Sequence, residues 1–435
     1  MRKFRLFNGE FGIHSGFHIQ FFGAGCSPLA LRESKFPVLS RGAIHFHTFQ
    51  LGIRLALERH ESRQEKSIWE GVGRVSRRES HLREDAIMLL TLKYIKFPLA
   101  LAPLVFLLPA LTFAQYNRTD LVTDATDSNL VNGWGLTRSG GSPFWVSDNG
   151  TGKSTLYNGA GQKFPPASPL VVTIPPAPGT TVLGTPTGDV FNITVGNPTP
   201  SFSVSNGVTS GTALFIFATL DGTISGWSPG VDFTNALIAA DRSKAGAVYT
   251  GLAITSDASG DFLYAADNGP NSRIDVFDKD FNLVSSFTDP AIKGGLAPYG
   301  IQNIGGNLWV TFGGNKSSAG FVDEFDAAGN VLMRITGPLQ SPWGLAMAPA
   351  DFGPFSNTLL VANNVPGGRI NAFDPNTGAF LGTLRDSNGQ AIVIDQLWAL
   401  QFGNGGNGGK PNQLFFTAGP NNYANGSFGM ITFEP

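Results

Sequence analysis

A pattern that recurs six times along the chain constrains the fold more than any other feature of the sequence. Five units begin with similar short segments: "NGWGL" (132–136), "YTGLA" (249–253), "APYGI" (297–301), "SPWGL" (341–345) and "QLWAL" (396–400). Each segment is followed by two short runs rich in β-branched and aromatic residues, bounded by turns of Gly, Asn and Asp. A less regular sixth unit begins near "PTGDV" (186–190).

Six units of three or four short strands predict an all-β fold, a six-bladed β-propeller with four-stranded antiparallel blades. The last unit stops at its third strand, whereas residues 118–124 precede the first unit without belonging to it. We therefore expect residues 118–124 to pair with the strand at 428–434 and close the ring, which also protects a sheet edge. The segment 191–211, rich in Ser, Thr, Pro and Asn, predicts a surface loop.

A three-part sequence pattern typical of an export signal lies just before residues 115–435, which form the predicted propeller. Lys93 and Lys96 form a positive region, an uncharged apolar run follows, and small residues surround Phe113. These three parts predict a cleaved signal peptide at 88–114, with Gln115 as the new N-terminus. A buried segment or a membrane anchor remains as the alternative. Cleavage would leave no membrane anchor and would place the protein in the periplasm or outside the cell, where we expect a monomer.

Residues 1–87 differ in composition from the rest of the chain. They contain all six histidines and the only cysteine, Cys26, and they show no sustained hydrophobic period. We interpret this segment as an extension created by a misassigned start, with Met88 as the true start, and not as a folded domain. A genuine basic extension that binds anionic surfaces is the alternative.

The composition of residues 115–435 restricts the function. This part carries 14 basic and 23 acidic residues, which argues against a general affinity for nucleic acid. Because it lacks His and Cys, it cannot build a Ser–His or Cys–His pair or a typical zinc site. Carboxylate chemistry and calcium-assisted hydrolysis remain open. The spacing of Asp278, Asp280 and Asn282 approaches that of a calcium loop without its glycine and closing Glu, so a solvated turn is the alternative.

The repeat unit resembles the NHL-type repeat and is similar to gluconolactonase and paraoxonase-like six-bladed propellers. The "NGWGL…FWVSDN" opening and the "SPWGLA" motif also resemble an uncharacterised family of secreted bacterial propellers. This resemblance covers 116–435 and implies the fold and export, without an established activity. In the gluconolactonase-like enzymes, the residue before "G-(L/I)" ligates a metal in certain blades. The corresponding residues here include no carboxylate or carboxamide, so we expect no metal there: Trp134, Thr187, Thr250, Tyr299, Trp343 and Trp398.

The four aromatic residues of this column have two interpretations. They either plug the central channel as core or form a stacking platform for a sugar ring or peptide side chain. We expect them in one ring near the channel mouth, on the face where the "DN" loops end. Four residues near those loops are further ligand-binding candidates, with turn formation as the alternative: Asp148, Asp267, Asn363 and Arg369.

These features predict a secreted binding or scaffold propeller that engages a glycan, a peptide or another protein. Its binding surface would be the aromatic funnel mouth and the neighbouring loops, and no cofactor is expected. The alternative is a calcium- or carboxylate-dependent hydrolase, such as a lactonase. An empty channel with convergent carboxylates would favour the enzyme, whereas a channel filled by Trp side chains would favour binding on the loops or rim.

Overall fold

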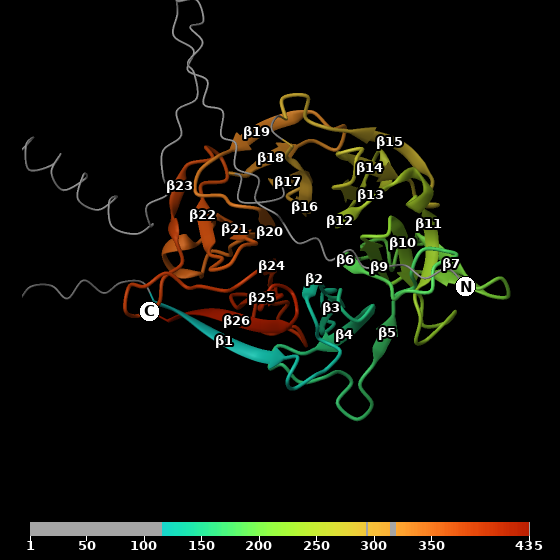
Figure 1. Ribbon diagram of the computed structural model, residues 1–435, viewed down its shortest axis with the longest axis horizontal. Helices are drawn as coiled ribbons and strands as arrows, with labels where there is room; N and C mark the ends of the chain where they lie inside the picture. Colours follow the sequence, from blue (N-terminus) through green and yellow to red (C-terminus); the bar gives the residue numbers. More distant parts are fainter. Residues whose placement is uncertain (1–114, 293–294, 314–318, 435) are drawn as a thin grey trace, which may run out of the picture. The chain divides into compact units, whose positions relative to one another are not determined.

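A computed structural model describes residues 115–292, 295–313 and 319–434. The predicted signal peptide at 88–114 and the extension at 1–87 lie outside these residues. The described part is an all-β, six-bladed propeller of four-stranded antiparallel sheets, confirming the predicted fold (Figure 1). The only helical turns among the described residues are two short 3₁₀ turns, Ser243–Ala245 and Gly353–Phe355, so none of their helices could span a membrane.

The blades follow one another along the chain, and each of the first five runs from its innermost to its outermost strand. Blade one contains β2 (Gly133–Thr137), β3 (Phe144–Asp148), β4 (Lys153–Tyr157) and β5 (Val171–Thr173). Blade two contains β6 (Pro186–Phe191), β9 (Phe215–Thr219), β10 (Thr223–Trp227) and β11 (Leu237–Asp241). Blade three contains β12 (Tyr249–Asp257), β13 (Gly260–Asp267), β14 (Arg273–Phe277) and β15 (Leu283–Phe287).

The second half of the ring repeats this order. Blade four contains β16 (Ala297–Ile304), β17 (Asn307–Gly313), β18 (Phe321–Phe325) and β19 (Val331–Ile335). Blade five contains β20 (Pro342–Met347), β21 (Leu359–Asn363), β22 (Ile370–Phe373) and β23 (Phe380–Thr383). Blade six contains β24 (Leu397–Phe402), β25 (Leu414–Ala418), β26 (Ser427–Glu434) and, as its outermost strand, β1 (Gln115–Thr123).

The N-terminal strand closes the ring as predicted. In Figure 1, β1 lies along the outer side of β26, although the two strands occupy opposite ends of the described chain. The pairing runs from Gln115 opposite Glu434 to Thr123 opposite Ser427, and it includes Arg118 opposite Ile431. The expected pairing of 118–124 with 428–434 is therefore confirmed, although the strand begins three residues earlier than we expected.

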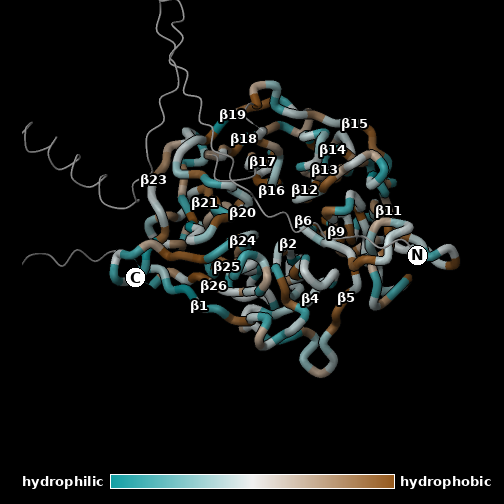
Figure 2. Tube along the Cα trace, viewed as in Figure 1, coloured by the Kyte–Doolittle hydropathy of each residue, from teal (hydrophilic) through white to brown (hydrophobic). Residues whose placement is uncertain are grey.

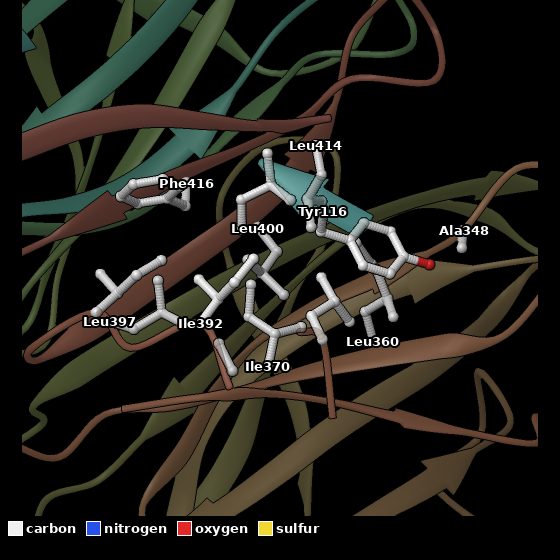
Figure 3. Close-up of a cluster of buried hydrophobic side chains, with 14 of the residues drawn as sticks. Tyr116, Ala348, Leu360, Ile370, Ile392, Leu397, Leu400, Leu414 and Phe416 are labelled. Carbon is white, nitrogen blue, oxygen red and sulfur yellow. The ribbon is translucent and has the colours of Figure 1, made fainter. Parts of the chain in front are cut away.

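Apolar side chains between neighbouring blades hold the ring together, and Figure 2 shows apolar stretches along many of the strands. The largest such cluster lies between blades five and six and includes Tyr116 of β1 (Figure 3). The Tyr116 ring is 1% exposed, and its hydroxyl donates a hydrogen bond to the Phe352 carbonyl (2.8 Å). Tyr116 thus anchors the closing strand to blade five as well as to its own sheet.

The innermost strands contact one another in the order β2, β6, β12, β16, β20, β24 and back to β2. Glycine permits the close approach between several of these strands. A Cβ atom on Gly300 would lie 2.1 Å from the Trp343 carbonyl oxygen, and one on Gly344 would lie 2.2 Å from the Trp398 carbonyl oxygen. The repeated glycine is therefore a packing requirement of the channel wall.

The segment expected to be a surface loop, 191–211, is in part a structured element. It contains β7 (Ser203–Ser205), which pairs with β8 (Ser210–Thr212). Phe202 is fully buried, and its ring centroid lies 5.3 Å from that of Phe281 in the β14–β15 turn. The surface-loop prediction was wrong for this part, because the Phe202 side chain supplies core packing between blades two and three.

Candidate functional site

The four aromatic residues of the predicted column lie together in one cluster. The Trp134 and Trp398 rings stack with their centroids 3.5 Å apart. Trp343 and Tyr299 meet Trp398 edge-on, at centroid distances of 5.8 and 5.7 Å. Because these residues come from β2, β16, β20 and β24, the side chains of four innermost strands converge as predicted.

These rings face one another and fill the axial region. Trp134, Trp343 and Trp398 are 6%, 8% and 1% exposed. The Trp398 indole N–H donates to Asn132 Oδ1 (2.8 Å), and the Trp343 N–H donates to the Thr250 carbonyl (3.0 Å). The cluster therefore has the geometry of a plug, whereas a ligand-stacking role for its rings stays a prediction.

The two threonines of the column are also buried. Thr187 Oγ1 donates to the Tyr249 carbonyl of the next blade (2.8 Å), and Thr250 Oγ1 donates to the Ala266 carbonyl (3.3 Å). The exposed fractions of Thr187 and Thr250 are 0% and 3%. In this arrangement their hydroxyls bind backbone carbonyls.

The loops that follow β3, β13 and β21 lie within their blades but make hydrogen bonds to the next blade. Each carries an Asn whose amide donates to a carbonyl of the next blade: Asn149 to Pro186 (3.1 Å), Asn268 to Pro298 (2.8 Å) and Asn364 to Leu397 (3.2 Å). Asp267 is fully buried and accepts hydrogen bonds from the Val248 and Gly269 N–H groups (both 2.9 Å). These contacts agree with the turn interpretation and add an inter-blade contact that sequence reasoning missed.

Two of the predicted site residues, Asn363 and Arg369, line a cavity of about 590 Å³. This cavity lies between blades four and five, on the face where β3, β13 and β21 end; we call it the DN face. Other polar side chains in its wall are Gln340, Asn371 and Thr383. Among the described residues that line it, Arg369 alone is charged.

Hydrogen bonds fix the amides at the base of this cavity. Asn363 Oδ1 accepts from the Gln340 N–H (3.2 Å), and Asn363 Nδ2 donates to the Pro338 carbonyl (2.9 Å). Asn371 Nδ2 donates to the same carbonyl (2.8 Å) and its Oδ1 accepts from Thr383 Oγ1 (2.7 Å). The side chain of Arg369 is exposed and is the group in this wall most able to turn toward a ligand.

Two buried carboxyl groups near the channel are unusual. Asp148 and Asp189 are 0% and 7% exposed, and among the described residues none of their carboxyl oxygens has a hydrogen bond of normal length. The hydroxyls of Thr155 and Ser147 are the side-chain groups that favour their charged forms. Burial raises the pKa of both carboxyl groups well above the usual Asp range. Sequence reasoning missed Asp189, although its position inside a strand rather than a turn was a usable signal.

Asp189 lines an axial cavity of only about 20 Å³, together with residues from all six innermost strands. A cavity of this size can hold a water molecule but not an organic substrate. Among the described residues, aromatic side chains therefore fill the axial region, and Asp189 is the one carboxyl group that lines the small cavity there. An open channel with several convergent carboxylates would have favoured a hydrolase.

The replacement Asp189→Asn is expected to stabilise the protein at neutral pH. Since the folded-state pKa is raised, the folded protein keeps this proton to a higher pH than the unfolded chain. Stability therefore falls by about 1.4 kcal/mol per pH unit between the two pKa values, and Asn removes that slope. Thermal unfolding at pH 4 and pH 8 should show a gain for the variant mainly at pH 8.

The exposed carboxylate Asp351 provides the matched control, because Asp351→Asn removes a charge without changing a buried group. Its effect on the unfolding temperature should be small at both pH values. An Asp189→Asn variant whose effect is the same at pH 4 and pH 8 would show that Asp189 is already ionised in the folded protein.

The turn at 278–282, whose spacing approaches that of a calcium loop, uses the Asp278 carboxylate for hydrogen bonds within the turn. Asp278 Oδ1 accepts hydrogen bonds from the Asp280 and Asn282 N–H groups (3.0 and 2.8 Å), and Asp278 Oδ2 accepts from Asn282 Nδ2 (3.1 Å). These are the contacts of a solvated turn. No group of three or more His, Cys, Asp or Glu side chains suited to a metal ion occurs within residues 115–434 where the structure describes them.

Known proteins similar to this chain include two from Acanthamoeba polyphaga mimivirus. "Uncharacterized protein R648" is 30% identical over 340 residues, which cover 72% of this chain and 78% of the relative. "Uncharacterized protein L690" is 31% identical over 295 residues, which cover 63% of this chain and 74% of the relative. The chain matches no protein-family model.

Among solved structures, the chain is similar to a glucose dehydrogenase and to a streptogramin B lyase. The first has a TM-score of 0.44 and 12% identity, with 72% of this chain and 98% of the other covered. The second has a TM-score of 0.37 and 12% identity, with 73% of this chain and 97% of the other covered. At these identities neither activity transfers to this chain.

Proposed function

The chain belongs to the family that includes the mimivirus proteins R648 and L690, and we propose that its propeller is a binding module. Its ligand would be a glycan, a peptide or another protein, bound on the DN face. The observation that carries this proposal is the polar cavity between blades four and five, which contains Asn363 and Arg369. Its volume of about 590 Å³ falls within the range of about 300–1,000 Å³ that is usual for ligand sites.

The lining favours a ligand that carries a carboxylate. The Arg369 guanidinium can form two parallel hydrogen bonds with a carboxylate, and this geometry is specific as well as strong. The exposed side chain of Gln340 and the hydroxyl of Thr383 can pair with hydroxyl or amide groups beside it. An acidic sugar and the C-terminus or an acidic side chain of a peptide share this chemistry.

The aromatic cluster supports this location of the site. Since its rings are buried against one another, the cluster fills the axis and leaves the surrounding loops as the accessible surface. The hydrolase alternative has no comparable support, because Asp189 lines a cavity too small for a substrate. Binding, rather than turnover, is therefore the function that the geometry favours.

Export remains part of the proposal. It is supported by the three-part pattern at 93–114, with a cleaved signal peptide at 88–114. A secreted or periplasmic location would bring the DN face into contact with extracellular glycans and proteins. The resemblance to secreted bacterial propellers points the same way, whereas the two relatives above are viral proteins.

The replacement Arg369→Ala is expected to weaken binding of carboxylate ligands about tenfold to a hundredfold. A hydrogen bond to a charged group contributes about 1.5–3 kcal/mol, and 1.4 kcal/mol corresponds to a factor of ten. Titration of residues 115–435 with uronic-acid oligosaccharides and acidic peptides, at low and high salt, would measure this. The difference between the parent and the variant should shrink as the salt concentration rises.

Lys410 provides a matched control. It is exposed and lines a second cavity, of about 500 Å³, that the β24–β25 loop forms with residues 158–160 at the opposite face of the propeller. Lys410→Ala removes one positive charge without touching the DN face, so it should leave binding unchanged. Equal affinities of the parent and the Arg369→Ala variant for every carboxylate ligand would refute the proposed site.

A further inference from the structure

The loop between β25 and β26 places an aromatic ring over the buried cluster. Tyr423 lies in this loop and is 36% exposed, whereas Trp398 beneath it is 1% exposed. The two ring centroids are 5.6 Å apart, with an angle of 36° between the planes. Tyr423 is thus the outermost ring of the aromatic cluster and the one that covers Trp398.

The backbone of this loop is strained. Asn421, Asn422 and Tyr423 have φ values of 56°, 53° and 68°, which places three consecutive residues in the left-handed region. Asn tolerates this region, but a bulky residue such as Tyr adopts it rarely and at a cost in energy. Such strain persists only where surrounding contacts maintain it, and it is common at ligand sites and switches.

A buried acceptor determines where the hydroxyl of Tyr423 lies. The hydroxyl donates to Asn364 Oδ1 (2.8 Å), and the Tyr299 hydroxyl lies 3.5 Å from the same oxygen. Asn364 is 3% exposed, and its Nδ2 donates to the Leu397 carbonyl (3.2 Å). Because that contact fixes the amide, Asn364 Oδ1 remains directed at the phenolic hydroxyl.

We propose that Tyr423 is a displaceable cap and that a 4-hydroxyphenyl group of a ligand can take its place. The ring of the ligand would pack on Trp398, and its hydroxyl would donate to Asn364 Oδ1. This inference goes beyond the proposed function, because neither Arg369 nor its cavity takes part. The side chain of Tyr423 itself demonstrates the fit of such a group to this position.

Displacement of the cap requires only a local change. The hydrogen bonds within the loop are backbone contacts: the Tyr423 N–H donates to the Gly419 carbonyl (2.8 Å), the Ala424 N–H to the Asn421 carbonyl (3.2 Å) and the Asn425 N–H to the Pro420 carbonyl (3.1 Å). The Asn425 amide also donates to Asp124 Oδ2 (2.7 Å), which holds the end of the loop while Tyr423 moves. Residues 419–426 belong to no strand, so the ring can leave without breaking a sheet. A ligand ring would restore the contacts that Trp398 loses, and release of the left-handed backbone would favour the open loop.

Two variants separate a displaceable cap from a structural side chain. Tyr423→Phe keeps the ring but removes its hydrogen bond to Asn364, so the cap should open more readily. Tyr423→Gly removes the ring and suits the positive φ, so the loop should keep its conformation. The probe is 4-methylphenol, and toluene, which lacks the hydroxyl, is the matched control. Binding can be followed by calorimetry and by tryptophan fluorescence.

If Tyr423 is a cap, the parent protein should bind 4-methylphenol, and Tyr423→Phe should bind it about threefold to tenfold more tightly. Tyr423→Gly should bind it more tightly still. Addition of Asn364→Leu to the Phe variant should abolish the preference for 4-methylphenol over toluene. Binding by the Gly variant alone, with none by the parent or the Phe variant, would show only a filled hole and would overturn the proposal.

The same titrations show whether the 4-hydroxyphenyl group belongs to a peptide or to a free phenolic compound. N-acetyltyrosine amide and a tyrosine-containing peptide present the group as a protein would, and tighter binding of these than of 4-methylphenol indicates a peptide partner. Equal binding of all three indicates a free phenolic compound. The result for Arg369→Ala does not affect these measurements, so the two proposals can fail separately.

Discussion

Replacement of Gly344 by alanine is expected to destabilise the propeller by about 3 kcal/mol. A Cβ atom at this position would lie 2.2 Å from the Trp398 carbonyl oxygen and 3.1 Å from the Leu400 backbone nitrogen. Both contacts are with the backbone of β24, so no side-chain rotation can relieve them. Blades five and six would have to separate, and neighbouring blades would lose part of their packing. Urea denaturation of residues 115–435 measures the change.

Gly230→Ala is the matched control, since nothing lies within 4 Å of the Cβ position at Gly230. Neither glycine has a positive φ, so a strained backbone does not explain a difference between the two substitutions. The control should change the free energy of unfolding by less than about 0.5 kcal/mol. Similar values for both variants would mean that the ring can expand at no cost and that glycine is not required for inter-strand contact.

The repeat made the fold predictable because one physical requirement recurs in every blade. One position within the innermost strand must be small enough for the next strand to approach, and Gly300 in β16 and Gly344 in β20 show this directly. Closure of the ring was predictable for a related reason: the last unit lacked a strand, and only residues near 118–124 were available to supply it. Both inferences depend on backbone pairing, which a sequence pattern reports well.

Side-chain packing was harder to predict from the sequence than strand pairing. Phe202 is a single buried ring within a polar segment, so no hydrophobic periodicity in the sequence indicates that it is buried. Asp189 belongs to the "PTGDV" segment that opens the irregular unit and lies within β6, but the repeat pattern does not show that its carboxyl group is buried beside the axis. Whether the tryptophans would plug the channel or line it depended on the distances between their rings, and these follow from the three-dimensional arrangement of four strands.

The candidate site was predictable only in part. Asn363 and Arg369 could be named because they flank a loop after a repeated strand, but Gln340 and Thr383 could not. Thr383 ends β23 of the same blade, and Gln340 lies in the β19–β20 connection, so both line the cavity with Arg369 only once the sheet is paired and the ring is assembled. A cavity between blades is a property of the assembled ring, and the separate repeats do not reveal it.

Replacement of Trp398 by alanine is expected to cost about 3–5 kcal/mol of stability, the largest effect of any single substitution proposed for this protein. Trp398 is 1% exposed and contacts the rings of Trp134, Tyr299, Trp343 and Tyr423. Its removal leaves a cavity at the axis that the surrounding strands cannot close, because each is held by its own blade. It also leaves Asn132 Oδ1 without its N–H donor. Chemical denaturation at neutral pH would measure the loss.

Trp398→Phe serves as the comparison, since it retains a ring but loses the indole N–H and part of the volume. Its cost should be clearly smaller than that of the alanine variant. A loss below about 1 kcal/mol for Trp398→Ala would show that the rings are not a structural plug, and the cluster would then be better explained as a surface retained for binding. In that case the alanine variant should keep its fold while losing affinity for ring-shaped ligands on the DN face, which the 4-methylphenol titration would detect directly.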